Sequence, residues 1–133
     1  MSDIGLALFH KVTNTAGVSS LIGTRFYPVA MPQTATFPLA VYQFITGENI
    51  KTHGAPSALP RPRCQITAWA LTFAEVVAID NAIKTAIDGK RETWGTGAST
   101  TIVHECSPEE PRDDRDPVTG LYWRSRDYFI RYK

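Results

Sequence analysis

Two segments of the chain carry apolar residues at the spacing of an amphipathic helix. In the segment SDIGLALFHKVTN, at residues 2–14, the apolar positions are Ile4, Ala7, Leu8 and Val12. In residues 72–89 they are Val76, Ile79, Ile83, Ala86 and Ile87. Such stripes predict two helices that each pack one face on a core. Between the first helix and the first strand, Gly17 and Gly23 bracket a short second turn.

The second helix has explicit start and stop signals. Thr72 as N-cap and Glu75 three residues later form a capping-box pattern, and Leu71 and Val76 occupy the positions of a hydrophobic staple. Gly89 is expected to end the helix in a left-handed conformation.

The charged residues of this helix are expected to be solvated. Asp80, Lys84 and Asp88 are interpreted as pointing away from the core, and the spacing of Asp80 and Lys84 favours an ion pair one turn apart. The helix therefore resembles a scaffold element rather than a catalytic one.

Five segments have the composition of β-strands. They are RFYPV (25–29), LAVYQFIT (39–46), RCQITAWAL (63–71), TTIVHEC (100–106) and LYWRSRDYFIRYK (121–133). Pro28 places the first near a sheet edge or a strand end, and the apolar run at 39–46 should be covered on both faces. In residues 63–71 apolar and polar positions alternate, so one face is expected to be buried.

Two long polar segments interrupt the pattern. Residues 47–62 contain Gly and Pro without periodicity, and they predict a long arm joining two antiparallel strands. Residues 108–120 are charged and Pro-rich and are expected to form a loop.

The order of elements predicts an α+β fold with a mostly antiparallel sheet packed against two helices and a long protruding hairpin arm. A chain of 133 residues is expected to form a single domain over residues 1–133.

Charge and cysteine content exclude several classes of protein. Lys and Arg number 14 against 13 Asp and Glu, so no basic field favours nucleic acid or a membrane surface. Cys64 and Cys106 are interpreted as reduced thiols. No secretion signal or membrane-spanning run is found, which predicts a protein made and kept in the cytoplasm.

Candidate catalytic and ligand-binding patterns are weak throughout. His104 and Cys106 share a strand face but lack further ligands, and the run DDRDPVTG lacks the Glu that closes a calcium loop. The glycines of WGTGAST have no phosphate-binding Lys. We therefore expect no catalytic residues, no metal and no cofactor.

The C-terminal strand combines aromatic and basic residues. Its face is made by Tyr122, Arg124, Arg126, Tyr128, Ile130 and Tyr132. Three interpretations remain open: stacking on single-stranded nucleic acid, contact with another protein, or packing on the chain's own helices.

Three stretches in this order resemble one family. GTRFYPVAMPQTATFPLAVYQFI, RCQITAWALTFAEVVAIDNAIKTAIDG and DPVTGLYWRSRDYFIRY are similar to the tail completion, or tail terminator, proteins of long-tailed bacteriophages and prophages. The resemblance covers nearly the whole chain.

This resemblance implies a structural virion protein without enzymatic activity. The implied assembly is a homo-hexameric ring at the head-proximal end of the tail, assembled in the host cytoplasm. The ring would stop polymerisation of the major tail tube protein and present a surface to the head-tail connector or head-closure protein. Genomic DNA would be passing cargo only, and no membrane would be involved.

Charged residues of the arm, the acidic loop and the last strand are the expected contacts with other subunits or partners. They are Glu48, Lys51, His53, Arg61, Arg63, Glu109, Glu110, Asp113, Asp114, Asp116, Arg124 and Arg126. The alternatives are another neck component, either a head-closure or an adaptor protein, or a small α+β enzyme or ligand-binding domain.

Overall fold

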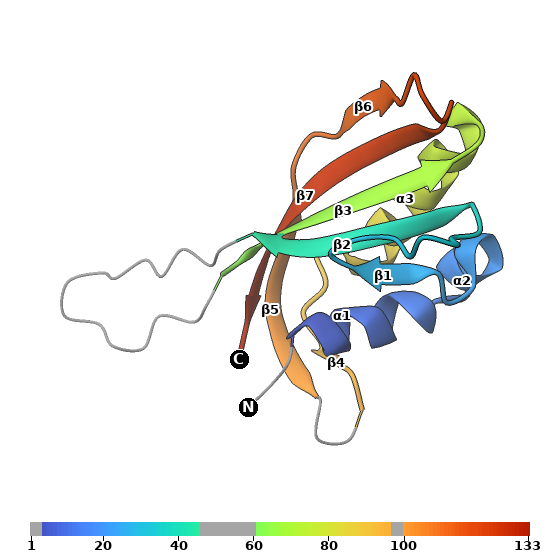
Figure 1. Cartoon of the computed structure of the whole chain (residues 1–133). Helices are drawn as coiled ribbons and strands as arrows, with labels where there is room; N and C mark the ends of the chain where they lie inside the picture. The colour runs from blue at the N-terminus through green and yellow to red at the C-terminus, as the bar shows by residue number, and fades with distance from the viewer. Residues whose placement is uncertain (1–3, 46–60, 97–99) are drawn as a thin grey trace.

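The computed structural model describes residues 4–45, 61–96 and 100–133. Its elements in chain order are α1 (Ile4–Thr13), α2 (Ala16–Ile22), β1 (Phe26–Pro28), β2 (Leu39–Ile45), β3 (Arg63–Ala70), α3 (Phe73–Ile87), β4 (Thr93–Trp94), β5 (Thr101–Pro108), β6 (Arg112–Arg115) and β7 (Tyr122–Tyr132). The strands form one curled sheet, and the helices lie against one of its faces (Figure 1). The other face has no helical cover in the described part of the chain.

The longest strand, β7, lies at the centre of the sheet. The strand order is β1-β2-β3-β7-β5-β4, and β6 also pairs with β7. β3 follows one edge of β7, while β5 and β6 share its other edge at opposite ends. Among the strand pairs of the described residues, only β1 and β2 run parallel. The predicted α+β fold with a mostly antiparallel sheet is therefore confirmed, and β1 is at the predicted edge.

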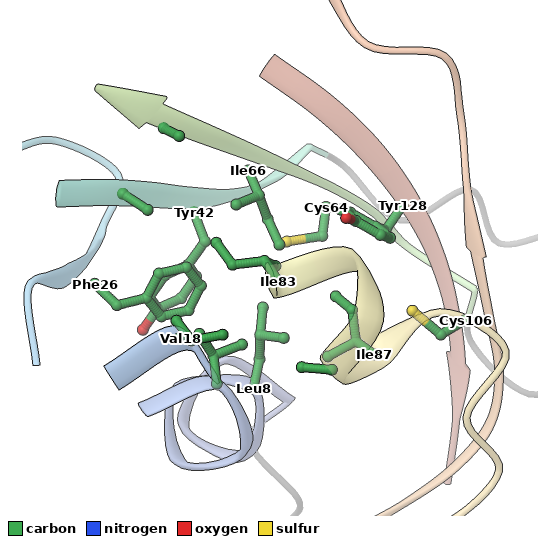
Figure 2. Close-up of a cluster of buried hydrophobic side chains, with 14 of the residues drawn as sticks. Leu8, Val18, Phe26, Tyr42, Cys64, Ile66, Ile83, Ile87, Cys106 and Tyr128 are labelled. Atoms are coloured by element: carbon green, nitrogen blue, oxygen red, sulfur yellow. The ribbon is translucent and has the colours of Figure 1, made fainter. Parts of the chain in front are cut away.

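Both predicted helical stripes are buried. All four apolar positions of α1 and all five of α3 lie in the core. Figure 2 shows Leu8, Ile83 and Ile87 of the helices meeting Ile66 and Tyr128 of the sheet. This layer is the principal hydrophobic contribution to stability, because fully burying one large aliphatic side chain contributes about 1.5–3 kcal/mol.

A third helix, α2, replaces the predicted short turn. Val18 and Ile22 are one helical turn apart and both are buried, so this segment also contributes to the core. Gly23 follows with φ of 60°, a conformation that suits glycine. The prediction of two helices was therefore one helix short.

The signals at the start and end of α3 act as predicted, with one exception. The Thr72 hydroxyl accepts a hydrogen bond from the Glu75 N–H at 3.3 Å and donates one to the Glu75 carboxylate at 2.9 Å. Gly89 has φ of 68°. Leu71, however, is 65% exposed, so the predicted hydrophobic staple buries little of its surface.

Two short strands lie outside the five predicted strand segments. β4 carries Trp94, whose ring is buried and whose indole N–H donates to the Glu92 carboxylate at 3.0 Å. β6 lies within the charged segment 108–120 and pairs with the first residues of β7. All four β6 residues are exposed, so backbone pairing rather than burial defines this strand.

Strands β2 and β3 pair as predicted, from Leu39 opposite Trp69 to Ile45 opposite Arg63. The predicted arm at residues 47–62 lies outside the described residues up to residue 60. No helix in the described part of the chain is long and apolar enough to cross a membrane.

Candidate interaction surface

The uncovered face of the sheet is built from alternate residues of β3 and β7. On β3 the even-numbered residues are buried, so Gln65, Thr67 and Trp69 point to the opposite face. Trp69 lies beside Trp123 of β7, with ring centroids 6.2 Å apart. Both rings are half-buried, and aromatic residues are enriched where proteins contact each other.

Polar side chains hold the centre of this face in a fixed arrangement. Gln65 donates to the Ser125 hydroxyl at 2.8 Å, and the Thr67 hydroxyl donates to the same oxygen at 3.2 Å. Beside them, an open groove of about 310 Å³ runs under the segment that follows β1. Its lining is Val29, Ala30, Met31, Val41, Gln43, Gln65, Thr67 and Trp69.

A cluster of basic and aromatic groups lies at the start of β3. The guanidinium groups of Arg61 and Arg63 lie 4.4 Å and 4.7 Å from the centre of the Phe129 ring. Arg61 pairs with Glu105 at 2.8 Å, and Arg131 approaches the same carboxylate at 3.9 Å. The hydrogen bond from Arg61 lowers the pKa of Glu105. The predicted residues Arg61 and Arg63 thus lie together.

Arg124 and Arg126, also predicted as contact residues, bind carboxylates of their own chain. Arg126 is 7% exposed and makes two hydrogen bonds to Asp80, at 3.1 Å and 2.8 Å. It also donates to the Glu109 carbonyl at 2.8 Å. Arg124 makes two hydrogen bonds to Asp113, at 2.7 Å and 3.1 Å, and lies 3.5 Å from Asp80. These bonds tie α3 to β7 and β6.

The interpretation of Asp80 as a solvated charge was wrong, because this residue is 5% exposed and its partner is Arg126 rather than Lys84. A signal was present in the sequence. Asp80 lies four residues after Val76 and three before Ile83, on the apolar stripe itself. A charge on such a stripe requires a buried partner, and Arg126 alternates with Tyr128 on the inward face of β7.

The predicted acidic contact residues divide into two groups. Glu109 and Glu110 are exposed on the segment joining β5 to β6. Asp113 and Asp114 lie on β6, and Asp116 begins the turn into β7, where its carboxylate accepts the Val118 N–H at 2.9 Å. The remaining predicted contacts, at Glu48, Lys51 and His53, lie outside the described residues.

The two cysteines are core residues. Burial raises the pKa of the Cys106 thiol to about 12, and burial also raises that of Cys64. Figure 2 shows both on the core side of the sheet. Within the described ranges, no group of three or more His, Cys, Asp or Glu residues is placed to hold a metal ion.

Comparisons with known proteins found one matching family and a solved structure with a similar fold. The family described as tail completion protein gp17 matches residues 6–133. A chain in the solved virion of a native gene transfer agent (GTA) particle has a similar fold, with a TM-score of 0.67 and 13% identity. The match covers 94% of this chain and 90% of that one. No curated protein matches the sequence.

Proposed function

Since the chain belongs to the tail completion protein gp17 family, we propose that it forms a hexameric ring at the head-proximal end of a phage tail. The protein is a structural component of the virion tail. In the proposed role the ring stops polymerisation of the tail tube protein and offers a joining surface to the connector or head-closure protein. In this role genomic DNA passes through the ring, and the protein does not recognise its base sequence.

The family match carries this proposal, because it extends from α1 to the end of β7. The uncovered sheet face supports it, since Trp69, Trp123 and the neighbouring arginines are residue types enriched where proteins meet. The GTA virion chain, which shares the fold, comes from an assembled particle.

A rigid frame is what such a ring requires of each subunit. In a closed ring every subunit must present the same surfaces at the same angle. The two hydrogen bonds from Arg126 to Asp80 and the ion pair between Arg124 and Asp80 fix α3 against β7. We propose that the protein acts through this fixed geometry, without catalysis and without a cofactor.

Removing the protein from its phage tests the role. Without it, tails are expected to be longer than normal and unattached to heads, and supplying the wild-type chain in trans should restore both properties. Tail length distinguishes this role from that of another neck component. Tails of normal length that fail to join heads would indicate a head-closure or adaptor function instead, and normal virions would contradict both.

A further inference from the structure

The two ends of the β3–β7 pair carry different chemistry. In their antiparallel register Ala70 lies opposite Tyr122 at one end, and Arg63 lies opposite Phe129 at the other. Eight residues of β3 separate the two ends by about 23 Å at ~3.3 Å per residue. Figure 1 shows the first end beside the start of α3 and the β6–β7 turn, and the second at the start of β3.

The first end, here called the acidic end, combines exposed apolar side chains with carboxylates. Its members are Leu71, Phe73, Asp113, Asp114, Asp116, Val118 and Tyr122. Phe73 and Tyr122 are in edge contact, with ring centroids 6.1 Å apart. Val118, at the tip of the turn, is 90% exposed. An isolated subunit gains nothing from an apolar side chain there.

The carboxylates of the acidic end are only partly neutralised by their own chain. Asp113 is paired with Arg124. Among the contacts of the described residues, the Asp114 carboxylate accepts the Arg115 N–H, and that of Asp116 accepts the Val118 N–H. Neither forms a salt bridge within the described part of the chain. Arg115, whose guanidinium lies 5.7 Å from the centre of the Tyr122 ring, offsets one of these two charges, so this end keeps one negative charge to offer a cationic surface.

The opposite end, here called the basic end, has the complementary excess. Its members are Arg61, Arg63, Phe129, Arg131 and Lys133, with Glu105 and Asp127 as internal counter-charges. Arg61 and Glu105 are paired at 2.8 Å, whereas the contacts from Arg63 to Asp127 and from Arg131 to Glu105 are longer, at 3.6 Å and 3.9 Å. The side chains of Arg63 and Arg131 are exposed, and loosely held surface charges contribute at most about 1 kcal/mol, so these two side chains are available to a partner's carboxylates.

We propose that the acidic end of one copy binds the basic end of the next. The inference rests on the proposed ring, and it names the surfaces that join its subunits. Val118 and Leu71 would lie against the stem of Arg131 and the ring of Phe129, while Asp114 and Asp116 would meet the cationic side chains. Because the two surfaces differ and lie at opposite ends of one subunit, each copy uses both, as a closed ring requires.

Two variants with one disabled end each test this arrangement. Asp114→Lys with Val118→Lys reverses the acidic end, and Arg131→Glu with Lys133→Glu reverses the basic end; all four positions are exposed. Asn81→Lys and Lys84→Glu on α3 are the matched controls, because they also introduce a Lys or a Glu, but on the helical side of the molecule. Native mass spectrometry over a range of protein concentrations gives the size of each assembly.

Each variant alone is expected to remain monomeric where the wild type and the controls form rings. An equimolar mixture of the two variants should associate again, because the intact basic end of one variant meets the intact acidic end of the other, and the two reversed ends are also opposite in charge. Rings formed by both variants at wild-type concentrations would overturn the proposed contact while leaving the ring itself in place.

A wild type that stays monomeric in solution moves the test to assembled tails. There, electron microscopy of the head-proximal end shows which surfaces of neighbouring copies touch. Contacts between acidic and basic ends support the inference, and contacts through other surfaces overturn it. Absence of any ring at that position would instead contradict the proposed function on which the inference rests.

Discussion

Asp80 connects the helical layer to the sheet through a buried ion pair. Its carboxylate accepts two hydrogen bonds from Arg126, and the same guanidinium also donates to the Glu109 carbonyl. Every charged atom of the pair therefore has a partner, which is the condition under which buried charges are tolerated. The pair raises the pKa of Arg126, so its charge persists over the accessible pH range.

Replacing Asp80 with Asn is expected to destabilise the protein by about 3–5 kcal/mol, because the change leaves a buried guanidinium without its carboxylate. Urea unfolding followed by circular dichroism measures the effect. Asp88→Asn is the control, since this exposed carboxylate lies at the C-cap of the same helix and its loss should cost less than about 0.5 kcal/mol. Equal midpoints for the two variants would contradict this account of Asp80.

The cysteines yield a second prediction at the residue level. Because burial raises the pKa of Cys106 to about 12 and that of Cys64 in the same direction, almost no thiolate exists at pH 8. Neither thiol of the folded protein should react with iodoacetamide at that pH, whereas both should react in denaturant. Mass spectrometry counts the labels, and rapid labelling of the folded chain would refute the prediction.

At the scale of elements, apolar periodicity explains what could be predicted. α1, α3, β3 and β7 each place several apolar residues on one face, so burial determines both their type and their orientation. The acidic and basic ends could not be predicted in the same way, because their residues come together only through the register of β3 with β7.

Strand β6 shows why other elements were missed. RDDR has no apolar face, and it forms a strand because β7 extends beyond β5 and leaves backbone groups to pair. The burial of one predicted contact residue was missed for a related reason. Arginine is usually a surface residue, yet the alternation of side chains along β7 directs Arg126 inward, toward Asp80.

The N-cap of α3 is a local feature that can be tested alone. Thr72→Ala removes the acceptor of the Glu75 N–H and should lower the free energy of unfolding by about 1 kcal/mol. Thr72→Ser keeps the hydroxyl and should behave nearly as the wild type. Leu71→Ala should also cost little, because Leu71 is already exposed. A cost for Leu71→Ala above that of Thr72→Ala would show that the hydrophobic staple matters more than the cap.

At the scale of the whole molecule, the fold separates stability from interaction. Helices cover one sheet face and provide the core, so the other face and the two ends of the β3–β7 pair remain for contacts. Because the chain belongs to the tail completion family, we propose that several copies join through these surfaces into one ring.

Imaging the head-proximal end of assembled tails by electron microscopy tests this claim most directly. The map gives the position of the protein and the number of its copies in the same experiment. We expect six copies in a closed ring, placed between the last ring of tube protein and the head-joining proteins. A single copy per tail, or a location elsewhere in the virion, would contradict the account.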